Sequence, residues 1–429
     1  MGKPRWLVGI ALFGVLALVA AACAEEEGDG AGGGAAEACA ADAFGCVEVA
    51  EGDPIRFGTL LAITGDVAFL GLDSQAGAVV AADYYEDQTF DGVSNFMGHP
   101  IEFQHEDDGC SAEGGQAGST RLAADPTIVA VIGTSCSSSA LGVSDTVLGE
   151  QGIALISPSN TAPALTAPGT HQDFYLRTAH NDKIQGAAMA NFAFDELGLT
   201  TAATVHDGSP YADQLQQVFA DTFTSLGGTI TLQDAVQVGD TDFRSLLTQI
   251  AADQPEFLYY PIFEPEGNLL TKQALEIQGL SDTVLAGSDG LLTSNFVEDV
   301  GEVAEGRMFL SGPSLEFAGD FYEAELVPAI NELRGLEETT SVFHAHAWDA
   351  MNMVLNAVGE VAIEEGGTLF IPRTALKDAL FATSGYAGIT GSLTCNETGD
   401  CQPEVTISVS EIKNGEYNVV FTQTATLEA

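Results

Sequence analysis

A cysteine followed by three serines is the part of this sequence whose residue types most directly suggest chemistry. The motif VIGTSCSSS, residues 131–139, begins in an apolar run and ends where helical spacing begins. Serine is a preferred N-cap residue, so the start of a helix would explain the run. Alternatively, the hydroxyls and free N–H groups around Ser137 bind an anionic ligand, as helix N-termini readily do. The motif alone favours the capping role, so the remaining sequence must decide between the two.

Motifs of several enzyme classes are absent. No G-x-G-x-x-G opens a helix after the first strand, and neither a Walker A motif nor a G-x-S-x-G elbow occurs. The serine run has no neighbouring base. His344, His346 and Asp349 have the residue types of a metal cluster, but positions i and i+2 of a helix face different directions. We therefore expect no enzyme activity, no cofactor and no metal site.

Alternating strand and helix patterns must position the serine run. Short β-branched runs that predict strands lie at 55–63, 101–107, 128–133 and 153–158, and helical patterns separate them. The alternation restarts near residue 178, with strand patterns at 201–207, 229–238, 256–263 and 283–290. A long helix is expected at 344–366, followed by β-rich sequence. This order predicts two α/β units with mostly parallel sheets covered by helices, and a cleft between them suits a small ligand.

The charge balance excludes one class of partner. The 429 residues include 62 acidic and 13 basic side chains, which gives a net charge of −49. Nucleic-acid phosphates require Lys and Arg, so we expect no nucleic-acid partner. Repulsion between so many carboxylates weakens as salt shortens the screening length. The composition favours an outer-surface protein of a salt-tolerant organism over a merely acidic surface.

The first residues are typical of a bacterial export signal. Lys3 and Arg5 precede an apolar segment, and small residues lead to Cys23. The pattern resembles a lipoprotein signal, which implies cleavage before Cys23 and acylation of its thiol, although Ala20 stands where leucine is usual. An ordinary secreted protein cleaved nearby is the alternative. Glycine, alanine and acidic residues then predict a flexible tether over 23–52.

Seven cysteines in an exported chain are expected to be mostly oxidised. Without Cys23, six remain, and these can pair in 15 ways. Proximity in the sequence favours three pairs: Cys39–Cys46, Cys110–Cys136 and Cys395–Cys401. The second of these would hold the serine run rigidly, and the odd cysteine supports the lipid anchor.

Several strings occur in an order typical of one family: VIGTSCSSS, IALISPSNTAPALT, FYLRTAHNDKIQG, VHDGSPYADQL, FRSLLTQI, FLYYPIFEPEGN and LAGSDG. On these strings, residues 55 to about 420 resemble the leucine/isoleucine/valine-binding protein family, the type I periplasmic solute receptors of ABC importers. The resemblance implies two lobes joined by three hinge crossings that close around a ligand, and it supports the Cys110–Cys136 disulfide.

Site residues follow from the resemblance position by position. It implies that Ser137, Ser159 and Thr161 hold the ligand's α-carboxylate on the first lobe. It implies that Asp289 holds the α-ammonium, that Tyr211 closes over the ligand, and that Phe263 lies against the ligand's side chain. Each of these residues also has an ordinary structural explanation, such as capping for Ser137 and turn chemistry for Asp289.

Three departures from the family pattern bear on specificity. Leu70 stands where an aromatic residue is usual over the ligand, Asn160 replaces a small residue of the carboxylate loop, and Asp289 replaces a glutamate. A buried Asn160 would favour a polar ligand, because an unpaired buried polar group costs about 1–3 kcal/mol. These changes leave the amino-acid headgroup prediction intact and put the aliphatic side-chain preference in doubt.

We therefore predict a monomeric, extracytoplasmic, membrane-anchored receptor that binds an amino acid, branched-chain or related, and delivers it to ABC permease subunits. Receptors for a small amide, urea or aromatic acid, and a sensor without transport, are the alternatives. The predicted organisation is a signal peptide at 1–22, a tether at 23–52, a first lobe at 53–177 and 307–391, and a second lobe at 178–306 and 392–429.

Overall fold

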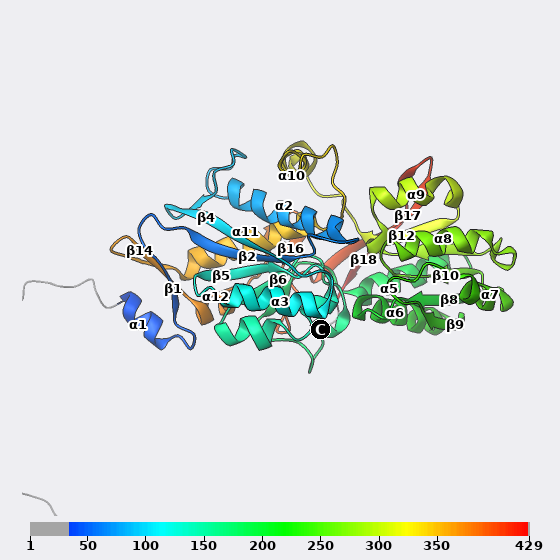
Figure 1. The fold of residues 1–429 in the computed structure, drawn as a ribbon, viewed down its shortest axis with the longest axis horizontal. Coiled ribbons are helices and arrows are strands. Elements are labelled where there is room, and N and C mark those ends of the chain that lie inside the picture. The colour runs from blue at the N-terminus through cyan, green and yellow to red at the C-terminus, as the bar shows by residue number, and fades with distance from the viewer. Residues whose placement is uncertain (1–33, 428–429) are drawn as a thin grey trace, which may run out of the picture.

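The computed structural model describes residues 34–427, which form two α/β lobes lying end to end (Figure 1). The predicted signal peptide and Cys23 lie outside the described residues. Between residues 34 and 427, no helix is both long and apolar enough to cross a membrane. The three expected disulfides are all present, at Cys39–Cys46, Cys110–Cys136 and Cys395–Cys401.

The first lobe is built on a six-stranded sheet in the order β3-β4-β2-β5-β6-β7. Its strands are β2 (Ile55–Leu61), β3 (Asn95–Phe96), β4 (His99–Asp107), β5 (Ile128–Gly133), β6 (Ala154–Ser157) and β7 (Tyr175–Arg177). All neighbours pair in parallel except the short β3. The helices of this lobe are α2 (Ala68–Tyr84), α3 (Ala112–Ala123), α4 (Ser137–Ala140), α10 (Val327–Arg334), α11 (His344–Val361) and α12 (Arg373–Phe381).

The second lobe is built on a seven-stranded sheet in the order β18-β17-β12-β11-β10-β8-β9. Its strands are β8 (Thr201–His206), β9 (Thr229–Ala235), β10 (Phe257–Tyr259), β11 (Val284–Gly287), β12 (Met308–Pro313), β17 (Glu404–Lys413) and β18 (Glu416–Thr426). The last two strands run antiparallel to their neighbours. Its helices are α5 (Asp182–Asn191), α6 (Pro210–Leu226), α7 (Arg244–Ala252), α8 (Glu266–Glu276) and α9 (Ser294–Ala304).

Within the described chain, three crossings join the lobes: one after β7, one after β12 and one before β17. The predicted return to the first lobe at residue 307 is wrong by one strand. β12 pairs with β11 and β17, so it belongs to the second sheet. Its short sequence, MFLSGP, carries no signal that distinguishes one sheet from the other.

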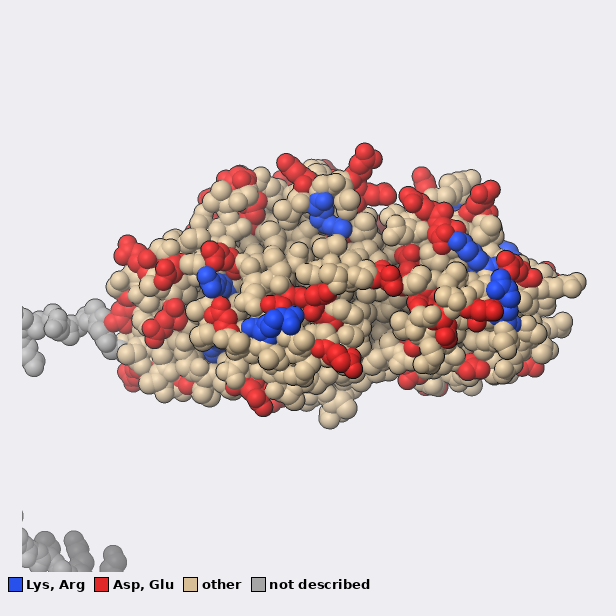
Figure 2. All heavy atoms as spheres, in the orientation of Figure 1, with Lys and Arg blue, Asp and Glu red and all other residues tan. Residues whose placement is uncertain are grey.

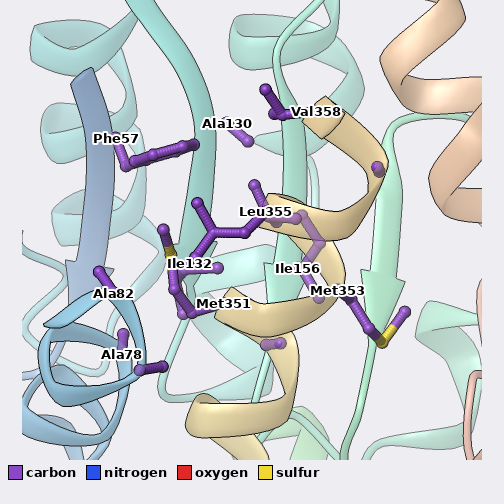
Figure 3. Close-up of a cluster of buried hydrophobic side chains, with 14 of the residues drawn as sticks. Phe57, Ala78, Ala82, Ala130, Ile132, Ile156, Met351, Met353, Leu355 and Val358 are labelled. Carbon is purple, nitrogen blue, oxygen red and sulfur yellow. The ribbon is translucent and has the colours of Figure 1, made fainter. Parts of the chain in front are cut away.

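The first-lobe core forms between the sheet and two helices, α2 and α11. Figure 3 shows Met351 and Leu355 of α11 among the strand residues Ile132 and Ile156, all of them fully buried. The helices approach closely at Gly77, where a Cβ atom would lie 2.3 Å from the carbonyl oxygen of His344. Burying a side chain such as Leu355 stabilises the fold by roughly 1.5–3 kcal/mol. This packing fixes the start of α11 beside the interlobe junction.

The predicted flexible tether is wrong for residues 34–52. Gly34–Ala41 form helix α1, and Cys46–Val49 form strand β1, which pairs with β14 (Thr368–Pro372). β14 also pairs with β13 (Ile363–Glu365), and a separate hairpin joins β15 (Tyr386–Gly388) and β16 (Gly391–Leu393). The Asp42 carboxylate accepts hydrogen bonds from the backbone N–H groups of Thr374 and Ala375 at the start of α12. The residues that pair with α1 and β1 lie more than 300 positions later in the chain. The local composition of residues 34–52 therefore does not predict that this segment is ordered.

We expect the Cys39–Cys46 disulfide to hold this N-terminal piece against β14. The double variant Cys39→Ser/Cys46→Ser should speed amide hydrogen exchange in β1 by about 30- to 100-fold, because closing so short a loop is worth about 2–3 kcal/mol in the chain-entropy model. Exchange measured by mass spectrometry at β5 is the internal control. Unchanged protection of β1 would show that strand pairing alone holds the segment.

Acidic side chains cover both lobes on the face shown in Figure 2, and the few basic ones mostly touch acids. Arg244 lies 2.9 Å from Glu276, and Lys272 lies 2.5 Å from Asp299. Such exposed pairs contribute about 0–1 kcal/mol each. They neutralise little of the net charge, and the salt-tolerance hypothesis stays a prediction.

Candidate ligand site between the lobes

A small cavity lies where the carboxyl ends of the strands of both sheets meet, the usual ligand position in parallel α/β sheets. Residues from both lobes line it: Phe69, Leu70, Ser135, Cys136, Ser137, Ser159, Tyr211, Phe263, Asp289, Gly290 and Phe343. Its free volume of about 10 Å³ has room for roughly one water molecule. A mouth of about 200 Å³ adjoins it and shares Ser137, Tyr211 and Phe263. An amino acid would therefore need the lobes to move apart to enter.

The first-lobe wall is a set of serines fixed by hydrogen bonds. Ser159 donates its hydroxyl hydrogen bond to the Ser135 carbonyl at 2.9 Å, and the Ser137 hydroxyl accepts one from the Ala162 N–H at 3.3 Å. Ser137 and Ser159 follow β5 and β6, which are parallel neighbours, so their loops emerge side by side. This wall brings the hydroxyl-bearing residues Ser137 and Ser159 and the start of the helical turn α4 to the cavity, and the first N–H groups of a helical turn have no partner within the turn.

The serine run does not act as a side-chain cap. Cys136 occupies the N-cap position of α4 without a side-chain hydrogen bond, and its sulfur is bonded to Cys110. The helical pattern after the run forms short pieces: α4 ends at Ala140, and a π-helical segment covers Ser144–Leu148. The Ser138 hydroxyl donates to the Cys110 carbonyl at 3.1 Å. The run therefore shapes a cavity wall.

Asp108 holds this wall from behind. Its buried carboxylate accepts hydrogen bonds from the N–H groups of Ser135, at 2.7 Å, and Cys110, at 2.8 Å. Burial raises the pKa of Asp108 to about 7, and the backbone hydrogen bonds oppose that rise. The disulfide and Asp108 together fix the loop 133–137 in the shape that exposes Ser137.

The second-lobe wall carries a carboxylate. Asp289 follows β11 and is 7% exposed. Its Oδ1 accepts hydrogen bonds from the Tyr211 hydroxyl at 2.9 Å and from the Gln185 side-chain amide at 2.6 Å. Burial raises the pKa of Asp289, and these two hydrogen bonds oppose the rise. Tyr211 and Gln185 thus aim a partly desolvated carboxylate at the cavity opposite Ser137.

The remaining wall is apolar. The rings of Phe263 and Tyr211 lie 5.1 Å apart between centroids, a favourable aromatic distance. Leu70 and Phe343 belong to one buried cluster, against which Phe69 and Phe263 pack. This cluster spans both lobes, so an apolar part of a ligand would contact each of them.

Two predicted ligand residues do not line this cavity. The Asn160 amide donates to the Thr134 carbonyl at 2.9 Å, and its oxygen accepts from the hydroxyls of Thr134, at 3.0 Å, and Tyr175, at 3.2 Å. The Asn160 side chain is therefore fully engaged inside the first lobe and requires no polar ligand, which corrects the prediction. Thr161 is 1% exposed and lies behind the wall, beside Asp182. Its side chain does not line this cavity.

Five cavity residues are not among the predicted ligand residues: Phe69, Ser135, Cys136, Gly290 and Phe343. Phe69 supplies, one position earlier, the aromatic ring that Leu70 lacks. Phe343 immediately precedes α11, and only the packing of α11 against α2 brings it to the junction. The sequence signal for Phe69 is its place directly before Leu70, the position at which an aromatic residue is usual.

His344 and Asp349 of α11 have separate structural partners, whereas the buried Nδ1 atom of His346 has no hydrogen-bond partner within residues 34–427. His344 contacts the Tyr322 hydroxyl at 2.8 Å and the Ser341 carbonyl at 2.9 Å. Asp349 accepts hydrogen bonds from the N–H groups of Ile389 and Thr390, both at 2.9 Å. Burial lowers the pKa of His344 to about 4 and that of His346 to about 3, so both are neutral at pH 7. These residues organise the core and do not share one ligand.

Comparison with known proteins assigns the class. The model of the family described as periplasmic binding protein matches residues 54–416, so the chain belongs to that family. The Leu/Ile/Val-binding protein BraC3 of Rhizobium johnstonii is 27% identical over 352 residues, 81% of this chain and 88% of that protein. The Leu/Ile/Val-binding protein of Escherichia coli is 29% identical over 270 residues, 63% of this chain and 70% of that protein. Both relatives are named as binding proteins.

Solved structures share the fold. The leucine-binding protein LivK of Thermotoga maritima aligns with a TM-score of 0.73 and 22% identity, covering 86% of this chain and 98% of that one. LivJ of Streptococcus pneumoniae, solved with isoleucine, gives 0.72 and 22%, covering 87% and 100%. A solute-binding protein of R. palustris, solved with benzoate, gives 0.70 and 20%, covering 88% and 98%. The two-lobed type I fold is thereby confirmed.

Proposed function

We propose that this protein captures a free amino acid, branched-chain or related, outside the cytoplasm and presents it to an ABC importer. The observation that supports this most is the placement of Ser137 and Asp289 on opposite lobes of one cavity. Hydroxyls and a free N–H suit a carboxylate, and Asp289 suits an ammonium group. A zwitterion fits both walls at once.

Charge explains closure in this proposal. A ligand shifts the balance between open and closed forms only by its differential affinity for them. In the open form an amino acid contacts Ser137 alone and gains little binding free energy. Only in the closed form do Ser137 and Asp289 contact it at the same time. The closed form therefore binds the zwitterion more tightly, as in hinge closure around ligands.

The apolar wall supports a ligand with an apolar side chain. Phe69, Leu70 and Phe343 lie beside the two polar walls and offer no charged group. The mouth carries the acidic side chains Asp66, Asp207, Glu264 and Glu266. An acidic side chain would meet repulsion there, so glutamate and aspartate are disfavoured ligands.

An aromatic acid is the second candidate, favoured by the aromatic residues of the cavity wall and by the R. palustris relative solved with benzoate. Such an acid offers its carboxylate to the serine wall but no cation to Asp289. The buried Asp289 carboxylate would then lack a counter-charge, which is unfavourable. The amino acid is the better match.

Export and anchoring belong to the same proposal. The N-terminal signal and Cys23 support a lipid-anchored, monomeric protein on the outer face of the membrane, whose partners are permease subunits. Mass spectrometry of the membrane-extracted protein tests this, because acylation adds a lipid mass at Cys23. A mature chain that begins elsewhere, without lipid, contradicts the anchor.

Isothermal titration against the twenty amino acids and benzoate, at low and high salt, tests the ligand. We expect binding of one or more apolar amino acids with a Kd in the micromolar range or below, and no binding of glutamate. Benzoate binding without amino-acid binding would favour the second candidate. No heat with any amino acid would contradict the amino-acid function and leave the fold assignment unaffected.

A further inference from the structure

A second carboxylate, Asp182, lies directly behind Asp289. Asp182, Asp289 and His180 have side-chain atoms within 4.8 Å of one another, and all three residues are buried. Asp182 is 0% exposed, and neither of its oxygens has a partner at full hydrogen-bond geometry within residues 34–427; the Thr161 hydroxyl lies near it and lowers its pKa. A buried carboxylate with so little support from donors is rare in folded proteins, so its state requires an explanation.

The backbone holds Asp182 in this place. Asp182 is the first residue of α5, and its N–H donates to the Thr161 carbonyl at 3.0 Å. One turn later in α5, Gln185 donates its amide to Asp289 at 2.6 Å and to the Ser311 carbonyl at 3.2 Å. One helix of the second lobe, α5, therefore carries Asp182 and also supports Asp289.

The groups that face Asp182 do not include a free cation. Arg177 lies close enough to favour the charged form of Asp182, but its guanidinium forms an ion pair with Asp400 and also binds Thr166. His180 is neutral at pH 7, because burial lowers its pKa to about 4. Tyr211 and Tyr259 also face the pair, and burial raises the pKa of both hydroxyls, so they stay neutral as well.

Two adjacent negative charges are therefore unfavourable in this site. Burial raises the pKa of Asp182 well above its ordinary value, and the charge of Asp289 raises it further. Burial also raises the pKa of Asp289. Two carboxyls this close titrate as a pair, and the first proton leaves more easily than the second. Two buried carboxyls within 4.8 Å of each other therefore favour holding a proton between them while no cation is present, although the Thr161 hydroxyl and Arg177 oppose the rise in the pKa of Asp182.

We propose that Asp182 is a positioning residue of the ammonium subsite, and that the Asp182–Asp289 pair shares one proton that the ligand's ammonium group displaces. The inference rests on the proposed amino-acid binding. On binding, the carboxyl O–H bond breaks and the proton passes to bulk water. The ammonium keeps its own hydrogens and becomes the counter-charge of both carboxylates. No electron is transferred.

The proposed proton exchange predicts how affinity depends on pH and how two classes of ligand differ. An amino acid should bind more tightly as pH rises through the range in which the pair titrates, by up to tenfold per pH unit where one full proton is released. An acid without an ammonium group gives the site no counter-charge and should release no proton. Proton release therefore separates the two ligand classes by chemistry.

Calorimetry in buffers of different ionisation enthalpy tests the exchange. With the amino acid identified above, the wild type should release between half and one proton at pH 7. Asp182→Asn should release less than a fifth of a proton, bind about tenfold more weakly at pH 8, and lose the pH dependence above pH 7. Equal release by Asp182→Asn and the wild type would overturn the proposal.

Asp349→Asn is the matched control. Asp349 is equally buried at 0% exposure, but its oxygens are hydrogen-bonded and it does not line the cavity. This variant should keep the proton release of the wild type. If both variants lost release together, general destabilisation would explain the result and the proposal would fail.

A ligand-free measurement separates this inference from the proposed function. Carboxyl ¹³C NMR of the unliganded protein follows both side chains directly. We expect the two resonances to titrate together and Asp182→Asn to lower the midpoint of Asp289 by one pH unit or more. Independent titration of both groups near pH 4 would refute the shared proton, whether or not an amino acid binds.

Discussion

Asp289→Ala should weaken binding of a zwitterionic amino acid by about 30-fold or more. Removing one partner of a buried charge pair in a binding site typically costs 2–5 kcal/mol, and each 1.4 kcal/mol is a factor of ten. The Tyr211 hydroxyl and the Gln185 amide, which both donate to Asp289, would also lose their acceptor. Titration calorimetry of the variant with the identified amino acid measures the loss.

Asp299→Ala is the control for this experiment. Asp299 lies in the same lobe but is exposed. Its carboxylate lies 2.5 Å from the Lys272 ammonium group, and neither residue lines the cavity. We expect its affinity to stay within about twofold of the wild type, because exposed pairs contribute little. Retention of wild-type affinity by Asp289→Ala would require a different partner for the ammonium group.

Arg177→Leu should lower the free energy of unfolding by about 3–5 kcal/mol, the range for breaking a buried ion pair from one side. Arg177 is 0% exposed, and its guanidinium contacts Asp400, the Asn160 carbonyl at 3.1 Å and the Ala162 carbonyl at 3.0 Å. These contacts join β7, the Asn160 loop and the segment before β17. Urea unfolding monitored by circular dichroism measures the change.

The matched surface variant is Arg244→Leu. Arg244 pairs with Asp242 at 3.2 Å and Glu276 at 2.9 Å on the exposed surface of the second lobe. Its loss should leave the midpoint of urea unfolding almost unchanged, because exposed ion pairs contribute little to stability. Similar losses in both variants would mean that the buried network around Arg177 contributes no more than an exposed pair.

Local sequence predicts the strands near the site well. The apolar run at 128–133 coincides with β5, because a strand buried on both faces must be apolar throughout. Glycines mark the end of α6, where Gly227 has the left-handed φ of 108°. The order of strands and helices was therefore sufficient for the fold class, and family motifs at the strand ends located Ser137, Ser159, Tyr211, Phe263 and Asp289 at one cavity.

Contacts between distant residues set the remaining features, and local patterns do not contain them. The hydrogen bonds that hold the Asn160 side chain inside the first lobe cannot be read locally, because its partner Tyr175 lies on the next strand. Asp182 was overlooked because an acidic residue at a helix start is ordinarily explained by favourable interaction with the helix N-terminus. Only the fold shows that α5 places it against a second carboxyl and away from solvent.

The pairing of β1 with β14 determines which lobe a membrane attachment would restrain. A lipid at Cys23 would leave residues 24–33 before α1, a span of at most roughly 36 Å when fully extended. α1 and β1 belong to the lobe built on β2 to β7, at the end farthest from β8 and β9 (Figure 1). That lobe would then stay near the bilayer surface, and the other would swing on each capture cycle.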